Sequence, residues 1–146
     1  MYWLSNIPYI NHNHDPQFIL ESYETEYIPG IQVKKISNQN HPAYQQYGLF
    51  ATKNWKPYQV LGEYTGVVTD KFINSNYLAS FSNISMSLGI NAEKMGNEMR
   101  FINHYKNIGN KPNCKFEQSY IHGKPVLLIV IIDNINKEDE ILIDYL

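Results

Sequence analysis

The sequence has very little cysteine, no large excess of charge and no long apolar run. Cys114 is the one cysteine among 146 residues, which excludes an internal disulfide and a zinc site built on several thiolates. The 12 basic and 14 acidic residues leave a net charge of −2, without the basic field typical of nucleic-acid binding. The longest strongly apolar run, residues 126–132, is far shorter than the roughly 20 residues that cross a bilayer. We therefore expect no metal site, no direct nucleic-acid partner and no membrane partner.

The start of the chain also lacks a recognisable export signal. Residues 1–4 carry no basic region, and Pro8 follows early, unlike a secretory signal peptide. We expect a cytoplasmic or nuclear protein, and export by another kind of signal stays open. The length fits one domain with its own core, and 43% hydrophobic with 18% charged residues is a globular composition.

Short apolar segments separated by turn residues predict a mostly β fold with few short helices. Strands are expected at residues 31–36, 47–51, 60–68, 86–90, 116–121, 126–132 and 141–145. The strand at 60–68 is expected to be interrupted at Gly62 and Gly66, since a glycine inside a strand often marks a bulge or a close approach of the backbone. The strands at 116–121 and 126–132 are expected to pair as a hairpin across His122-Gly123. Short helices are expected at residues 18–23 and 92–99, and residues 70–80 are expected to be helical or irregular. The His12 and His14 pair has metal-ligand spacing, but a solvated loop is the simpler reading.

Two distant segments place polar residues in apolar surroundings. The first, residues 99–104, contains Arg100, Asn103 and His104 beside Met, Phe and Ile. The second, residues 141–145, begins with an apolar run and ends with Asp and Tyr. Buried polar groups must be hydrogen-bonded, so each segment could be a satisfied part of the core. The alternative is one site assembled from both segments.

Three ordered motifs resemble those of the SET-domain protein lysine methyltransferases. The first is QYGLFA from residue 46 together with GEYTG from residue 62. The second is NAEKMGNEMRFINH from residue 91, followed by PNC from residue 112. The third is EDEILIDY from residue 138. Each motif alone is a weak signal, but their order over residues 46–145 is specific.

The resemblance implies a SET-type fold of small β-sheets, in which the C-terminal segment forms a pseudoknot with the loop that holds the Asn-His motif. Residues 46–146 would form the catalytic domain, and residues 1–45 a flanking segment packed on it. The implied activity is methyl transfer from S-adenosyl-L-methionine to the ε-amine of a lysine in a protein or peptide, a histone or another substrate. A catalytically silent SET-like module that binds the cofactor or a lysine-bearing peptide is the alternative.

The same resemblance assigns the site residues. Tyr145 is similar to the catalytic tyrosine, and Tyr64 to an active-site tyrosine that contacts the lysine. Ile143 takes the position that helps to set product number; it has no hydroxyl to hold a water, which favours di- or trimethylation. Tyr77 is a weaker candidate for the substrate pocket. The implied cofactor-binding residues are Gln46, Tyr47, Gly48, Arg100, Asn103 and His104.

These residue types suit the reaction. Methyl transfer requires a neutral amine, whereas a free lysine has a pKa near 10.4. An apolar, aromatic-lined channel lowers that pKa because it disfavours the charged form. Hydroxyl and carbonyl oxygens then orient the nitrogen lone pair.

Two departures from the family pattern bear on the site. Gln46 stands where the family usually has glycine, and Asn91 replaces an aspartate. The family's cysteine-rich, zinc-binding tail is also absent from a sequence that stops at Leu146. We expect the N-terminal forty residues, a second subunit of a homodimer or the substrate to close the lysine channel instead.

Overall fold

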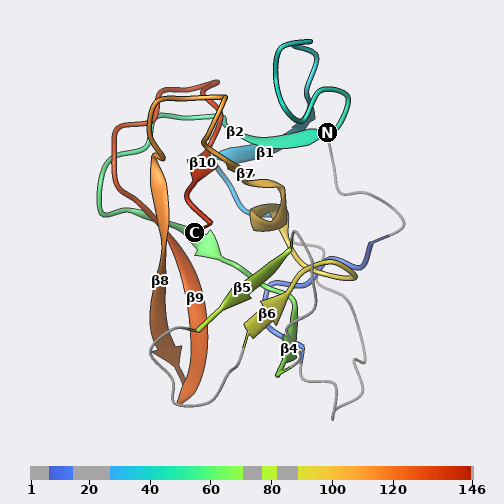
Figure 1. The fold of residues 1–146 in the computed structure, drawn as a ribbon. Coiled ribbons are helices and arrows are strands. Elements are labelled where there is room, and N and C mark those ends of the chain that lie inside the picture. The colour runs from blue at the N-terminus through green and yellow to red at the C-terminus, as the bar shows by residue number, and fades with distance from the viewer. Residues whose placement is uncertain (1–6, 15–26, 71–76, 82–88, 146) are drawn as a thin grey trace.

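The computed structural model describes residues 7–14, 27–70, 77–81 and 89–145. These residues form three small β-sheets and one short 3-10 helix, so the predicted mostly β fold is confirmed (Figure 1). In chain order the elements are β1 (Ile31–Lys35), β2 (Tyr47–Ala51), β3 (Val60–Glu63), β4 (Val67–Thr69), β5 (Leu78–Ser80), β6 (Gly89–Asn91), η1 (Glu98–Phe101), β7 (Asn103–His104), β8 (Cys114–Ile121), β9 (Lys124–Ile131) and β10 (Leu142–Ile143). No helix of the described residues is long and apolar enough to span a membrane.

The three sheets differ in size and pairing. Strands β1 and β2 form an antiparallel pair, and β4, β6 and β5 form a three-stranded antiparallel sheet in that order. The largest sheet has the order β3-β9-β8-β10-β7. Its central strand pair is the long β8–β9 hairpin, which the sequence predicted. His122 and Gly123 have φ angles of 51° and 75°, as a tight two-residue hairpin turn requires.

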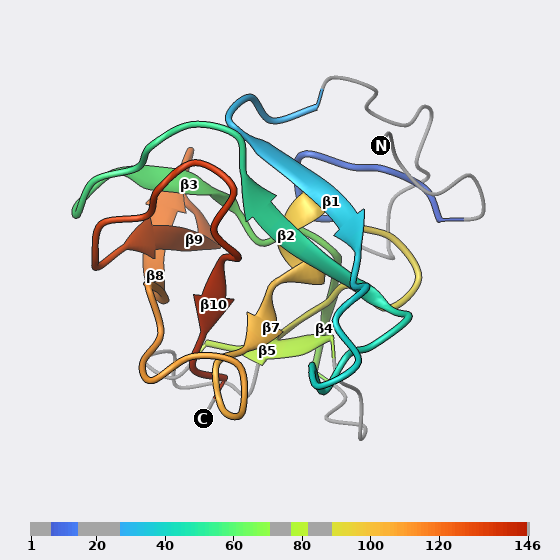
Figure 2. The ribbon, with the colours of Figure 1, turned by 90° about the horizontal axis from the view of Figure 1, so that it is seen from above.

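The C-terminal strand β10 lies between β7 and β8, which follow one another in the chain (Figure 2). It runs parallel to both, with Ile143 opposite His104 on one side and Cys114 on the other. The Asn113 side chain fixes this crossing, because it accepts a hydrogen bond from Leu142 N (2.9 Å) and donates one to Glu140 O (2.9 Å). The chain end is thereby threaded beside the Asn-His segment, as the predicted pseudoknot requires.

The core fills the space between the sheets. Its members include Leu49 of β2, Ile129 and Ile131 of β9, and Ile141 and Ile143 beside the chain end, all fully buried. Strand β9 is buried over most of its length because β3 and β8 flank it on both edges. Most of the apolar run that is too short for a membrane therefore lies in an interior strand of the largest sheet.

Residues 60–63 form β3 and residues 67–69 form β4, so the expected strand is divided in two. Both expected interruptions are observed, because the register shifts at Gly62 and the division falls at Gly66. The chain leaves the five-stranded sheet after β3 and enters the three-stranded sheet at β4. Gly66 sits at this crossing, where an added Cβ would lie 2.4 Å from the backbone oxygen of Asn91. This close approach of two backbones explains the glycine.

The helix predicted at residues 92–99 is also wrong. The 3-10 helix η1 begins only at Glu98, and the side chain of Asn97 caps it by accepting from Met99 N (3.1 Å). Gly96 before it is held in a backbone bridge to Tyr9. Tertiary contacts therefore override a locally helical sequence.

Other predicted elements are shifted or only partly described. The expectation of helical or irregular structure at residues 70–80 is wrong for residues 78–80, which form strand β5 because they pair with β6. The strand expected at 86–90 is observed as β6 at Gly89–Asn91, and residues 86–88 lie outside the described residues. The helix expected at 18–23 and residues 71–76 lie outside them as well.

The N-terminal residues 7–14 run along the three-stranded sheet. Ile10 N donates to Gly96 O, His14 N donates to Gly66 O, and the Thr65 hydroxyl donates to Ile10 O. His14 thus belongs to an extended bridging segment. Across the described part of the chain, no group of three or more metal-ligating side chains comes together.

Candidate functional site

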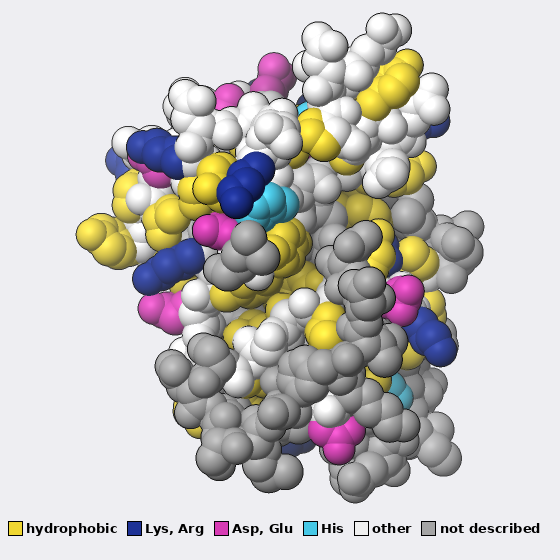
Figure 3. All heavy atoms as spheres, viewed as in Figure 1, with side chains coloured by type: hydrophobic (Ala, Val, Ile, Leu, Met, Phe, Trp, Pro, Cys, Tyr) yellow, Lys and Arg dark blue, Asp and Glu magenta, His cyan; other side chains and the backbone are white. Residues whose placement is uncertain are grey.

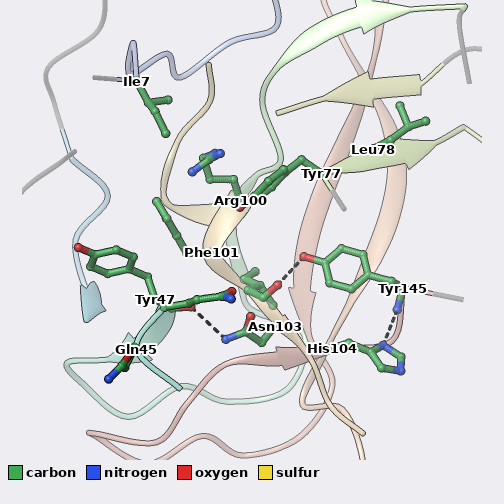
Figure 4. A pocket seen from close by; sticks show the side chains of 12 residues that line it. Ile7, Gln45, Tyr47, Tyr77, Leu78, Arg100, Phe101, Asn103, His104 and Tyr145 are labelled. Carbon is green, nitrogen blue, oxygen red and sulfur yellow. Dashed lines mark hydrogen bonds between the residues drawn. The ribbon is translucent and has the colours of Figure 1, made fainter. Parts of the chain in front are cut away.

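A cavity of about 760 Å³ opens where β2, η1, β7 and the chain end meet (Figure 4). It is lined by Ile7, Gln45, Gln46, Tyr47, Tyr77, Leu78, Arg100, Phe101, Ile102, Asn103, His104 and Tyr145. The two polar-in-apolar segments of the sequence therefore do meet at one place. Several of the predicted site residues line this cavity together.

Asn103 is held by both hydrogens of its amide nitrogen. Nδ2 donates to the backbone oxygen of Tyr47 (3.1 Å) and to Oε1 of Glu140 (3.0 Å). With the nitrogen engaged on that side, the amide oxygen is the atom that can accept a hydrogen bond from a ligand. Asn103 is thus a fixed acceptor at the cavity wall.

His104 supports the chain end through its side chain. Its Nδ1 accepts a hydrogen bond from the backbone N–H of Tyr145 (3.2 Å), while Asp144 Oδ1 lies 3.9 Å from the same nitrogen. An accepting Nδ1 carries no proton, so the neutral ring has its hydrogen on Nε2. The histidine therefore positions Tyr145.

Tyr145 presents a neutral phenol to the cavity. Its hydroxyl donates to the backbone oxygen of Ile102 (2.5 Å) (Figure 4). Burial, followed by the nearby phenol of Tyr64, raises the pKa of Tyr145 well above its ordinary value. Since the hydroxyl hydrogen is engaged, the oxygen lone pairs are left to face a ligand.

Tyr64 lies behind this wall. It is 1% exposed, and its hydroxyl donates to the backbone oxygen of Tyr77 (2.5 Å). Its ring packs edge-on against Phe116, with 5.5 Å between ring centroids, and Phe116 lies 5.7 Å from the ring of Tyr145. Tyr64 is absent from the described residues that line the cavity, and Phe116 connects it to Tyr145.

Comparison with known families supports the motif assignment. A family model for the SET domain matches residues 46–146. The chain belongs to the SET domain family. The family inferred from the three sequence motifs is thus confirmed.

Solved structures share this fold. A structure of ATXR5 in complex with histone H3.1 has 23% identity and a TM-score of 0.63, with 80% of this chain and 57% of that chain covered. A Polycomb Repressive Complex 2 structure from Chaetomium thermophilum, bound to an inhibitor, has 20% identity and a TM-score of 0.61, with 79% and 15% covered. The chain thus spans little more than half of the first protein and about a seventh of the second. A comparison with curated proteins finds no match.

Arg100 of the SET domain is mainly an anchor. Nε donates to Ala92 O (2.8 Å) and Nη2 to Glu93 O (3.2 Å), while the guanidinium lies 4.3 Å from the centroid of the Tyr77 ring. Burial lowers the pKa of this guanidinium, and the phenol of Tyr77 opposes that shift. Arg100 therefore ties the segment before η1 to Tyr77, which itself lines the cavity.

The first SET motif contributes both cavity wall and packing. Gln46 and Tyr47 line the cavity. Gln46 is not among the described residues with a positive φ; that conformation falls on Gln45, with φ 69°. Glutamine at position 46 is therefore compatible with its backbone. Gly48 leaves room for Glu140, because an added Cβ would lie 2.6 Å from its Oε1.

Ile143 is fully buried in the core between β7 and β8. Among the described residues, it is not part of the cavity lining. Tyr145, two residues further along the chain, lines the cavity instead.

Sequence reasoning missed several residues of the site. Phe116 was assigned only to a strand, although it lies two residues after the last residue of the PNC motif. Glu140 lies within the third motif but received no role, and it holds Asn103. Ile7 precedes the matched region, and no motif marks it.

Proposed function

We propose that this SET domain transfers a methyl group from S-adenosyl-L-methionine to the ε-amine of a lysine in a protein or peptide. One observation carries the proposal. A cavity in a chain of this family is lined by both a fixed amide acceptor, Asn103, and a half-buried neutral phenol, Tyr145.

The residues present fit the cofactor. A volume of about 760 Å³ lies within the range of pockets for ligands of this size. Asn103 would accept from an N–H or O–H group of the cofactor, and backbone groups of Gln46, Tyr47 and His104 would supply further polar contacts. Tyr47 and Phe101, whose rings lie edge to face at 5.9 Å, supply apolar surface.

When bound, the cofactor supplies an electrophilic methyl group on a sulfonium, and the amine lone pair forms the new bond as the sulfur keeps the old bonding pair. The chain itself excludes water and orients the amine. The phenol oxygen of Tyr145 accepts from the amine or contacts the polarised methyl group. The aromatic ring of Tyr77 at the cavity wall, together with Phe116 packed against Tyr145, supplies apolar surface that favours the neutral amine.

Tyr145 is thus proposed as the catalytic residue, with Tyr64 a second tyrosine of the lysine side of the site. Tyr64 would act on the channel from behind, since its hydroxyl holds the backbone of Tyr77. No proton acceptor on the protein is required, because the amine enters the site as a neutral base.

The flanking segment is proposed to complete the catalytic domain of residues 46–146. Ile7 lines the cavity, and residues 8–14 are bonded to Gly66 and Gly96. This supports residues 1–45 as part of the wall. A second subunit of a homodimer, or the substrate itself, would close what remains open.

The substrate class is a lysine-bearing protein, a histone being one candidate. The ATXR5 structure is a complex with histone H3.1, and the likeness to it concerns the fold. Incubation of the purified protein with methyl-labelled cofactor and a protein lysate, followed by mass spectrometry of the labelled residue, tests the proposal. Label on lysine supports it. Cofactor binding without any transfer would instead favour the silent module.

A further inference from the structure

We propose that His41, which precedes the SET match, is a positioning residue that orients Asn103 through Glu140 and so sets the affinity for the cofactor. This inference rests on the proposed function. It concerns a connection that reaches the cavity from the loop between β1 and β2.

Three side chains form a continuous hydrogen-bonded series. Asn103 Nδ2 donates to Glu140 Oε1 (3.0 Å), and His41 Nε2 lies 2.8 Å from the second carboxylate oxygen, Oε2. The side chains of His41 and Glu140 are only 7% and 10% exposed. The series is therefore shielded from water, where such bonds are strongest.

The second ring nitrogen of His41 shows which group donates in the hydrogen bond between His41 and Glu140. His41 Nδ1 accepts a hydrogen bond from the backbone N–H of Ala43 (2.9 Å). A nitrogen that accepts carries no proton, so the hydrogen of the neutral ring is on Nε2. His41 thus donates to Glu140, and the carboxylate receives one donor on each oxygen.

The backbone holds both ends of the series in place. Ile141 N donates to Leu49 O (2.8 Å), which fixes the Glu140 segment along β2. The loop that carries His41 is closed at its base, where Ile36 N donates to Gln46 O and Gln45 N to Ile36 O. Gly48 keeps the space for the carboxylate free.

The orientation of the Asn103 amide depends on this carboxylate. An asparagine can present either its oxygen or its NH₂ group after a flip of its amide. Because Glu140 and Tyr47 O both require donors, they hold Nδ2 on their side and leave the oxygen for the cavity.

Without His41, the Glu140 carboxylate can rotate away from Asn103 into a neighbouring cavity. Glu140 and His41 also line a second cavity, of about 460 Å³, whose wall includes Lys34, Lys35 and Phe50. Rotation into it would bring Glu140 toward two cations and away from Asn103. The imidazole donor therefore keeps the acceptor of the cofactor site in place.

Titration calorimetry with S-adenosylhomocysteine tests the inference. His41→Ala is expected to raise Kd by about 5- to 20-fold, the size of effect expected from losing one charge-assisted hydrogen bond. His41→Gln keeps an amide donor and should recover part of the affinity. His122→Ala, at the exposed hairpin turn, serves as the matched control and should bind as the wild type does.

A double-mutant cycle separates positioning from general damage. If His41 acts through Asn103, His41→Ala should add little to the loss already caused by Asn103→Ala. Equal Kd values for the wild type and His41→Ala, or the same fold loss in both backgrounds, would overturn the inference.

A second readout needs no cofactor. The side-chain NH₂ resonances of Asn103, assigned by their loss in Asn103→Ala, should shift and exchange faster with water in His41→Ala. Unchanged resonances would overturn the inference too. Failure of the wild type to bind S-adenosylhomocysteine would count against the proposed function alone, and this spectrum would still decide the role of His41.

Discussion

The hydroxyl of Tyr145 has one hydrogen, and the backbone oxygen of Ile102 already receives it. The phenol therefore acts through its oxygen lone pairs, and its raised pKa keeps it neutral. Such a group positions an amine and does not remove its proton. The ring of Tyr145 contributes packing against Phe116 in addition.

Replacing Tyr145 by Phe should therefore separate binding from catalysis. We expect kcat to fall by roughly 100-fold or more, while Kd for S-adenosylhomocysteine changes little, because the lost oxygen contributes mainly in the transition state. Steady-state kinetics and calorimetry measure the two effects. Tyr120→Phe, on the exposed end of β8, is the matched control. Near-normal turnover of Tyr145→Phe would remove Tyr145 from the mechanism.

Ile143 offers a prediction about product number. Ile143 is fully buried and lies outside the described cavity lining, so it leaves no hydroxyl near the amine to hold a water. We expect di- or trimethylated lysine at saturating cofactor. Ile143→Tyr should shift the product toward monomethyl-lysine, whereas Ile143→Phe, of similar size but without a hydroxyl, should not. Intact-mass spectrometry of the product decides. A wild-type product that stays monomethylated, with no difference between the two variants, would show that this position does not set the limit.

Glu63 makes the stability of the domain depend on pH. Burial raises the pKa of its carboxyl from 4.5 to about 7. Between these values the folded protein holds a proton that the unfolded chain has lost, so stability falls as pH rises through this window and stays reduced above it. Glu63→Gln is neutral at every pH and should avoid the loss.

The measurement is the thermal midpoint at pH 5 and pH 8. At pH 8 the thermal midpoint of Glu63→Gln should lie several degrees above that of the wild type, since each kcal/mol of unfolding free energy shifts the midpoint by roughly 2–4 °C. The difference between the two midpoints should be smaller at pH 5. Glu117→Gln, exposed on β8, provides the control. A gap that is the same at both pH values would rule out titration of Glu63 as its cause.

At the scale of elements, the site depends on two crossings of the chain. Strand β10 passes between β7 and β8 and brings Tyr145 to His104. The chain also passes from β3 to β4 at Gly66, against the backbone of Asn91. Both crossings place backbone against backbone, so they tolerate little added volume.

Gly66→Ala should therefore be costly. Its Cβ would lie 2.4 Å from a backbone oxygen, which cannot move aside as a side chain can. We expect a loss of about 2–4 kcal/mol in the free energy of unfolding, in the range of overpacked sites. Gly62→Ala is the matched control, because its Cβ would meet only side-chain ends of Ile28 and Met99 at 3.0 Å and beyond. Urea unfolding measures both, and equal losses would contradict the role given to the Gly66 crossing.

The elements that the sequence predicted well are those defined by local pattern. The β8–β9 hairpin follows from two apolar runs around His122-Gly123, and the meeting of the two polar-in-apolar segments follows from the ordered motifs. At Gly66 the sequence indicated an interruption, but not the passage to a second sheet against the backbone of Asn91. The irregular segment before η1 could not be predicted, because it depends on a contact with Tyr9. The roles of His41 and Ile7 depend on the tertiary structure in the same way.

Tyr64 shows how far a sequence motif can predict the position of a side chain. Its sequence context placed it in the site, but its hydroxyl is used on the backbone of Tyr77. Its ring packs against Phe116, which packs against Tyr145, and its phenol contributes to the raised pKa of Tyr145. A motif thus identifies the neighbourhood of a residue more reliably than the direction of its side chain.

At the scale of the whole molecule, the cavity is assembled from segments far apart in the chain. Residues of the flanking segment, β2, η1, β7 and the chain end all contribute to its wall. On the face shown in Figure 3, basic and acidic side chains are interspersed. This agrees with the small net charge and leaves substrate choice to local contacts around the cavity.

A crystal structure of the protein with S-adenosylhomocysteine would test most directly whether this cavity is the methyl-donor site. We expect the ligand to lie against Tyr47, Asn103 and His104, with its sulfur turned toward the hydroxyl of Tyr145. A ligand bound in the second cavity beside Glu140, or with its sulfur remote from Tyr145, would contradict the proposed site and its mechanism.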